Sequence, residues 1–293
     1  MSAKPVNVSR LNARRGRCEQ GMFMLLRLAS AVNVLALGGV FCFLVWNGGA
    51  AVSWEFLTMP PRRMMTEGGI WPCIVGTAAL AFGSMLLAFP LGVASAVYLY
   101  EYGGRKPFSR YIRLAISNLA GVPSVVFGLF GLAFFVTFLG MGVCILAGVL
   151  TLAVLTLPVI INTAEESLRS VPDSWREASL ALGATKSQTI ARVVLPAALP
   201  GMLTGAILGL ARTAGETAAI MFTAAVFFTP RMPDSVFSSV MALPYHIYVL
   251  ATAGTAIEKT RPLQYGTALV LIVLVFGMNL AAIVIRDRLQ RRH

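Results

Sequence analysis

The chain has 293 residues, of which 57% are hydrophobic and 12% are charged, and its mean hydropathy is +0.76. Soluble domains carry roughly 25% charged residues, so this composition excludes an ordinary soluble globular protein and predicts an all-α integral membrane protein. The cysteines have no paired spacing, which predicts neither a disulfide framework nor a metal site, and no cofactor is expected. They are Cys18, Cys42, Cys73 and Cys144.

Six apolar stretches are long enough to cross a hydrocarbon core, which takes about 20 residues of helix. The first follows a basic tail but is longer than the roughly 7–15 residues of a signal-peptide core, so it is interpreted as a retained anchor. Pro90, Pro123 and Pro158 fall inside the second, third and fourth spans and predict kinks there. The expected spans are residues 25–46, 70–98, 114–139, 141–161, 201–228 and 263–285.

The basic residues between these spans predict the orientation of the chain. With the N-terminus in the cytoplasm, seventeen lysines and arginines fall inside and five fall outside. This asymmetry follows the positive-inside rule, so both termini are expected in the cytoplasm. It also accounts for the net charge of +12 without nucleic acid. The predicted organisation is a basic tail at 1–24, a first span with an outward loop at 25–69, a helical bundle at 70–286 and a second basic tail at 287–293.

The longest outward loop, residues 229–262, contains an apolar run from Met241 to Thr252. This run is too short to cross a membrane. We expect it to form a surface-lying or re-entrant helix. His246 lies in the run beside two tyrosines, and it is interpreted as a packing residue.

The inward loop at about 165–198, between the fourth and fifth spans, has the local signals of two short helices. A proline favours a helix start, a glycine favours a helix end, and Thr-x-x-Gln is the pattern of a capping box. The two helices are expected to form an elbow on the cytoplasmic face. The signals are Pro172 and Asp173 for the first start, Gly183 for its end, Thr185 and Gln188 for the second start, and Pro196 for the second end.

Part of this loop resembles the EAA loop of bacterial ABC importer permeases. That pattern joins Glu-Ala-Ala, a glycine and a hydrophobic-x-Leu-Pro ending; Ser179 stands here where the family has its second alanine. The resemblance implies a coupling helix that sits in a cleft of a separate ATPase subunit. An amphipathic interfacial helix without a partner is the alternative, and it does not require the glycine. The implied coupling residues are Glu177, Ala178, Gly183, Leu195 and Pro196.

The fifth span holds Arg212 and Glu216 at membrane depth. Counted from Pro200, Arg212 lies roughly 18 Å along the helix, where each charge costs about 2.5–3.5 kcal/mol on insertion scales. The spacing of four places both side chains on one helix face, so a structural salt bridge is one interpretation. A substrate path is the other. Small residues around the pair let a helix or a hydrated cavity approach, which favours the path; they are Ala211, Thr213, Ala214, Gly215, Thr217 and Ala218.

A narrower likeness extends over most of residues 70–286. Four stretches resemble the phosphate-specific permeases of the importer family: residues 121–129, 168–172, 210–218 and 241–248. The resemblance implies the membrane subunit of an ATP-driven importer of inorganic phosphate in the cell inner membrane. It also implies an ATP-binding subunit, a second permease and an external phosphate-binding protein as partners, with membrane lipid around the bundle. In this hypothesis Arg212 offers its planar fork to phosphate, and Glu216 holds the guanidinium when the path is empty.

The sequence shows no catalytic apparatus. Lys186-Ser187 lacks the glycines of a phosphate-binding loop, because Thr185 stands where the motif needs a glycine directly before the lysine, and no glycine stands at the start of the motif. The chain is therefore not expected to be an enzyme, and ATP hydrolysis is assigned to another polypeptide. Two alternatives stay open: the permease of a sulfate or molybdate importer, and an ATP-independent transporter that binds an anion at Arg212.

Overall fold

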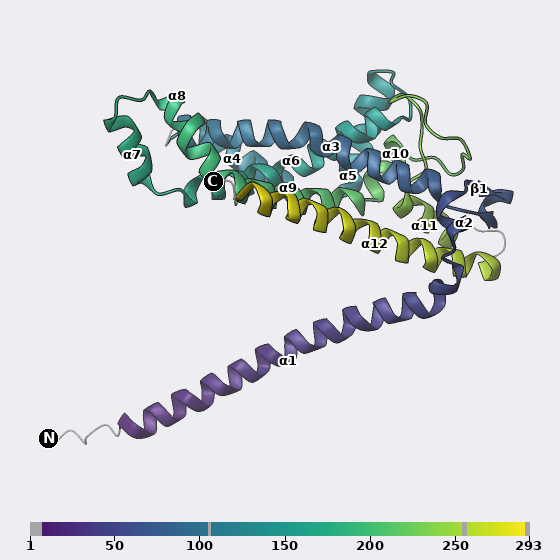
Figure 1. The fold of residues 1–293 in the computed structure, drawn as a ribbon, viewed down its shortest axis with the longest axis horizontal. Helices are drawn as coiled ribbons and strands as arrows, with labels where there is room; N and C mark the ends of the chain where they lie inside the picture. The colour runs from purple at the N-terminus through teal and green to yellow at the C-terminus, as the bar shows by residue number, and fades with distance from the viewer. Residues whose placement is uncertain (1–7, 105–106, 254–256, 291–293) are drawn as a thin grey trace.

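The computed structural model describes residues 8–104, 107–253 and 257–290. It shows an elongated helical bundle from which one long helix projects (Figure 1). The helices are α1 (Val8–Gly48), α2 (Trp54–Thr58), α3 (Trp71–Val97), α4 (Pro107–Ala120), α5 (Ser124–Gly131), α6 (Ile145–Ser170), α7 (Asp173–Ala181), α8 (Lys186–Thr189), α9 (Leu195–Ala214), α10 (Ala218–Thr223), α11 (Leu243–Thr252) and α12 (Ile257–Gln290). The shorter elements are the 3-10 turns η1 (Gly49–Ala51) and η2 (Arg63–Met65), the π-helical turns η3 (Tyr98–Tyr102), η4 (Leu132–Phe138) and η5 (Ile190–Val194), and the strands β1 (Pro61–Arg62) and β2 (Glu67–Gly68).

Among the described residues, five helical stretches are long and apolar enough to cross a membrane. The bent pair formed by α4 and α5–η4 makes a sixth if it is counted as one span. The prediction of an all-α, multi-pass membrane fold is therefore confirmed. The five stretches are Gln20–Ala51, Trp71–Tyr102, Ile145–Ser170, Lys186–Ala214 and Thr260–Arg288.

The third span, expected at 114–139, is broken instead of merely kinked. α4 ends at Ala120, and the chain restarts at Ser124 with its axis turned by 102°. Pro123 occupies the cap position of α5; its ring disfavours a helical conformation for the residue before it, so α4 cannot run through. By contrast, α3 and α6 continue through Pro90 and Pro158.

α6 lies at the centre of the bundle. Its most apolar window is 61% buried, against 33% for the spans that contain α3 and α9. α9 packs on α6 through glycines that recur every four residues, a spacing that lets two membrane helices approach closely. The contacts are Gly201 against Ser167, Gly205 against Thr163 and Gly209 against Thr156.

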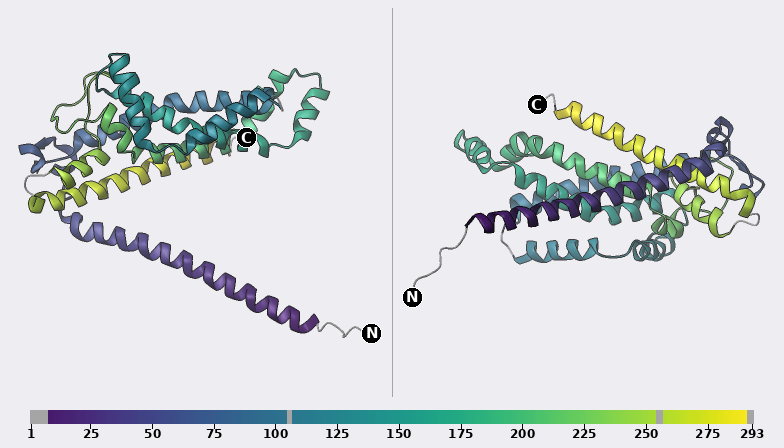
Figure 2. Two further views of the ribbon diagram at one scale, coloured as in Figure 1. Left: turned by 180° about the vertical axis from the view of Figure 1, so that it is seen from behind. Right: turned by 90° about the horizontal axis from the view of Figure 1, so that it is seen from below.

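α1 stands apart from the other helices. None of its most apolar window is buried, and at its C-terminal end Gly48 lies against Tyr265 and Gly266 of α12. Figure 2 shows the rest of α1 diverging from the bundle toward the N-terminus. The bundle of α3 to α12 is therefore packed without help from most of α1.

The two ends of the bundle carry different structures (Figure 1). At one end α7, α8 and the turn between them form the elbow, residues 173–189, with the C-terminal end of α12 nearby. At the other end, the hairpin end, β1 and β2 pair antiparallel and a buried cluster joins α2, α3 and α11. Leu243, Pro244, His246 and Val249 are buried in α11, so of the two forms expected for this run, surface-lying or re-entrant, a helix that lies free on the surface is excluded.

Candidate functional site

The elbow has the local structure that the sequence predicts. α7 ends at Ala181, and Gly183 follows in the left-handed region with φ of 85°, where a glycine has no Cβ to strain. Thr185 Oγ1 accepts a hydrogen bond from the Gln188 N–H, and the Gln188 side chain accepts one from the Thr185 N–H. This complete capping box starts α8 directly after the turn.

The second helix of the elbow does not end at Pro196, contrary to the prediction. α8 passes through η5 into α9, and Pro196 lies in the first turn of α9. The wider π-turn just before Pro196 lets the helix continue although the proline donates no backbone hydrogen bond. Lys186 to Ala214 therefore form one helical path of 29 residues that joins the elbow to the interior of the bundle.

The outer side of the elbow exposes large apolar side chains. Trp175, Leu180 and Leu182 are 52%, 48% and 89% exposed. Glu177, Ala178 and Gly183 are exposed beside them, whereas Leu195 and Pro196 are half-buried at the start of α9. An exposed apolar patch next to charged residues is typical of a surface that another protein covers.

Arg212 and Glu216 lie at an interruption of the fifth span, which we expected to run through 201–228. α9 ends at Ala214 and α10 begins at Ala218, so the two side chains do not share a helix face. Arg212 is exposed and Glu216 is half-buried. Neither side chain has a hydrogen bond or ion pair to the part of the chain that the structure describes. The salt bridge that the spacing allowed is therefore not formed.

This interruption changes the chemistry of the site. Non-helical backbone at membrane depth is tolerated only where protein buries it or where it lines a water-filled cavity. Gly215 and Glu216 both donate their N–H groups to the carbonyl oxygen of Thr213, which closes α9. Arg212 lies in the last turn of α9, where the negative end of the helix dipole favours a cation. The span thus ends in an exposed cation with a carboxylate just beyond it.

The structure brings together two stretches that the sequence analysis singled out, 121–129 and 210–218. A Cβ built on Gly128 would lie 2.9 Å from the carbonyl oxygen of Ala218 and 3.0 Å from the Cα of Ala219. Phe127 shares a buried cluster with Ala219. The two interrupted spans therefore pack against each other, α5 on α10, directly after the break that follows Arg212.

Sequence reasoning missed two features near these sites. The glycines at 201, 205 and 209 have the small-xxx-small spacing of a helix contact, so their contact with α6 could have been predicted from the sequence. Glu101 forms an ion pair with Arg176 across 75 residues of chain, and no local pattern predicts such a pair.

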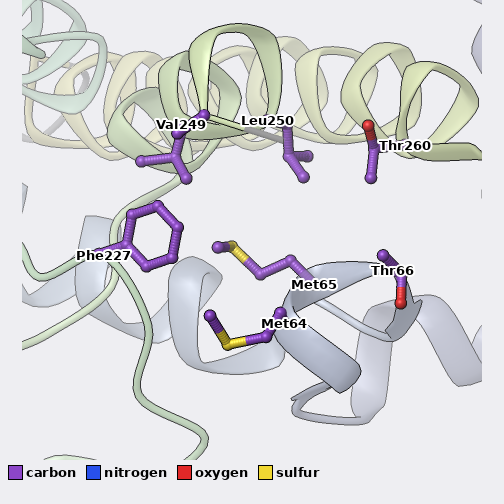
Figure 3. A pocket seen from close by; sticks show the side chains of 8 residues that line it. Met64, Met65, Thr66, Phe227, Val249, Leu250 and Thr260 are labelled. Carbon is purple, nitrogen blue, oxygen red and sulfur yellow. The ribbon is translucent and has the colours of Figure 1, made fainter. Parts of the chain in front are cut away.

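A small cavity of about 80 Å³ lies at the hairpin end, and Figure 3 shows its lining. Met64 and Met65 lie opposite Val249 and Leu250, with Phe227 to one side (Figure 3). No charged residue is among the described residues that line it. Without a cation or a cluster of polar donors it does not suit an anion, so Arg212 is the better candidate.

Solved structures with a similar fold belong to ABC importers. A chain of the MetNI methionine ABC transporter in an inward-facing conformation superposes with a TM-score of 0.61 at 22% identity, covering 74% of this chain and 94% of that chain. A chain of a bacterial ABC transporter involved in the import of the acidic polysaccharide alginate gives 0.60 at 16% identity, covering 95% and 99%. At these identities the likeness shows the fold alone, which is that of an ABC importer permease.

The sequence comparisons agree with this class. The family described as binding-protein-dependent transport system inner membrane component matches residues 88–293. The chain belongs to this family and is a multi-pass inner membrane protein. It is 36% identical over 274 residues to the probable ABC transporter permease protein YqgI of Bacillus subtilis, covering 89% of this chain and 92% of that protein. It is 41% identical over 226 residues to the phosphate transport system permease protein PstA 1 of Mycobacterium tuberculosis, covering 77% and 73%.

Proposed function

We propose that this chain is the PstA-type permease of an ATP-driven importer of inorganic phosphate. The similarity to PstA 1 of Mycobacterium tuberculosis supports phosphate as the substrate. The observation that carries the proposal is the exposed Arg212 at the interrupted end of α9, unpaired within the described chain. A charged group inside an apolar span marks a substrate or ion path by default.

Arg212 is suited to an oxyanion because its planar guanidinium donates two parallel hydrogen bonds to phosphate oxygens. Glu216 accepts a hydrogen bond from the protonated oxygen of HPO₄²⁻, which sulfate does not have at neutral pH. In the described conformation Glu216 does not hold the guanidinium, contrary to that part of the sequence-based hypothesis. Glu216 instead favours a protonated anion over a fully ionised one of similar shape.

The elbow supplies the contact to a separate ATP-binding subunit. Its exposed apolar side chains, with Glu177 among them, form the docking surface in this proposal. The helical path from Lys186 to Ala214 then joins that surface to Arg212, about 40 Å away at 1.5 Å per residue. The elbow end lies in the cytoplasm, as the basic residues predict. A second permease completes the pore, and an external phosphate-binding protein delivers the anion at the hairpin end.

Uptake of radiolabelled phosphate, with sulfate in parallel, tests the proposal. The measurement uses phosphate-starved cells that lack this gene and carry either the original chain or an Arg212→Gln variant. We expect the original chain to restore phosphate uptake alone. Arg212→Gln should lower it about 10- to 100-fold, because a hydrogen bond to a charged group contributes roughly 1.5–3 kcal/mol.

Arg288→Gln is the matched control, since Arg288 is an exposed arginine near the C-terminal end of α12. It loses the same charge and should transport like the original chain. Restored sulfate uptake, or molybdate uptake in the same assay, would reassign the substrate to another oxyanion. Unchanged phosphate uptake by Arg212→Gln would remove Arg212 from the path. Membership of an importer permease family gives no support to an ATP-independent anion transporter.

A further inference from the structure

A nearly buried ion pair fixes the elbow to the end of α3. The Nη2 atom of Arg176, in α7, lies 3.0 Å from Oε1 of Glu101, in η3, and the two side chains are 14% and 9% exposed. Arg176 also donates to the carbonyl oxygens of Leu168 and Val171, at 2.8 and 2.7 Å. One guanidinium therefore joins the elbow to the ends of both α3 and α6.

Further cations converge on the same π-turn. The Lys186 ammonium donates to the carbonyl oxygen of Glu101 and lies 4.9 Å from the centre of the Tyr102 ring. Arg113 of α4 donates to the carbonyl oxygen of Leu99 at 2.8 Å. The last carbonyls of a helix have no helical partner, and the negative end of its dipole attracts cations. Side-chain cations from α4, α7 and α8 thus bind the carbonyl oxygens and the carboxylate at the C-terminal end of α3.

Burial separates this pair from an ordinary surface pair. Arg63 and Glu67 at the hairpin end lie 2.7 Å apart, but their side chains are 76% and 54% exposed. Water and salt screen such a pair, so it contributes little to the stability of the fold. The Arg176–Glu101 pair is largely withdrawn from water. Removing Arg176 takes the ion-pair partner from a buried carboxylate, whereas removing Glu101 leaves Arg176 with its second ion pair, to Asp173 of α7. The link between elbow and α3 is therefore firm.

We propose that Glu101 is the attachment point through which the elbow moves α3, with Arg176 and Lys186 as positioning residues for transport. This inference rests on the proposed function. The elbow is covalently continuous with α6 before it and α9 after it, but in the described chain it reaches η3 through side chains. Through this link a displacement of the elbow by the ATP-binding subunit acts directly on the end of α3 as well as on α9. With the link broken, α3 follows the elbow less closely, and less phosphate is transported per ATP hydrolysed.

The test is the amount of phosphate transported per ATP hydrolysed by the assembled transporter in proteoliposomes with its binding protein. The variants are Glu101→Gln, Arg176→Gln and the double variant, with Glu67→Gln as the control that neutralises an exposed ion-paired glutamate. Each single variant should lower the ratio about tenfold, the scale of typical coupling free energies between sites. The double variant should lose no more than either single one, because the two residues act as a pair. Co-purification of the ATP-binding subunit and the control should match the original chain.

An unchanged ratio, or single losses that multiply in the double variant, would overturn the inference. If Glu101→Gln does not assemble, Lys186→Met decides, since it keeps the capping box and the apolar stem while removing the second tie. It should lower the ratio about fivefold, the lower end of typical coupling between sites; no change would count against the link. A wild-type transporter that carries another oxyanion would overturn the proposed function alone, because the ratio can be measured with that oxyanion.

Discussion

Gly205 of α9 lies directly against Thr163 of α6: a Cβ on Gly205 would come within 2.0 Å of Thr163 Oγ1. Thr163 Oγ1 is itself hydrogen-bonded to carbonyl oxygens of its own helix, so it cannot move freely aside. This contact holds α9, and with it Arg212, close to the central helix.

Gly205→Leu should separate α9 from α6. Overpacking a tight contact typically costs about 1–3 kcal/mol of stability, and we expect lower thermal stability of the detergent-solubilised chain together with reduced uptake. Gly277→Leu in α12 is the matched control, because a Cβ at Gly277 has nothing within 4 Å. Equal losses in the two variants would show that the leucine itself, and not the contact with Thr163, is responsible.

Gly183→Val should weaken binding of the ATP-binding subunit. Gly183 has φ of 85°, and a side chain in the left-handed region costs roughly 1–2 kcal/mol, so the turn between α7 and α8 should open. Gly140→Val places the same side chain at φ of 65°, also with free space around it, but outside the elbow. Co-purification of the ATP-binding subunit measures the difference. Loss in both variants would mean that general destabilisation explains the result.

Thr185→Ala should loosen the start of α8, because it removes one half of the capping box. A lost N-cap costs about 1 kcal/mol, which is roughly a fivefold change in the open population. Tryptic cleavage after Lys186 in the solubilised chain should quicken by this factor, while Thr185→Ser, which keeps the hydroxyl, should be cleaved like the original. Cleavage that is unaffected by Thr185→Ala would contradict a role for the cap in ordering the elbow.

His246 makes the hairpin end sensitive to acid. Burial lowers the pKa of His246 from 6.5 to about 4, and its Nδ1 has no hydrogen-bond partner among the described residues. Between these two pKa values the unfolded chain binds a proton at His246 that the folded chain does not. The contribution of neutral His246 to the free energy of unfolding is therefore fully present above pH 6.5 and declines as the pH falls toward 4. At about 1.4 kcal/mol per pKa unit the loss approaches roughly 3 kcal/mol. Thermal unfolding from pH 7.5 to 4.5 should show this decline.

His246→Phe is the variant that checks the assignment, because it fills the buried site with a ring that cannot be protonated. Its thermal stability should decline less between pH 7.5 and 4.5 than that of the original chain. A decline of the same size in both would assign the acid sensitivity to other groups.

The sequence predicts where the apolar segments lie along the chain, because hydropathy largely sets where a helix can cross a membrane. It also predicts the elbow, since Gly183 and the Thr185–Gln188 pair act within one turn of chain. The break after Arg212 was not predicted. The residues around it are mostly small and apolar, so their sequence does not exclude a continuous helix. The interruption between Ala214 and Ala218 goes together with the packing of α10 on Gly128, a contact between distant parts of the chain.

Ion pairs also show what local sequence patterns can and cannot predict. The spacing of Arg212 and Glu216 suggests a pair that the fold does not form, whereas Glu101 and Arg176 form one that no local spacing indicates. Charges four residues apart meet only if the helix between them is continuous. Charges far apart in sequence meet only when the bundle has assembled, so neither outcome follows from local pattern.

The π-turn η5 also sets the direction in which Arg212 points. Elbow and arginine belong to one helical path, so their relative orientation about its axis depends on the number of residues between them. Removing or adding one residue between Thr189 and Leu195 would turn Arg212 by about 100° and carry it away from its exposed face. Four added residues would nearly restore its direction but move it about 6 Å along the axis. This segment is therefore under a length constraint that its apolar composition does not reveal.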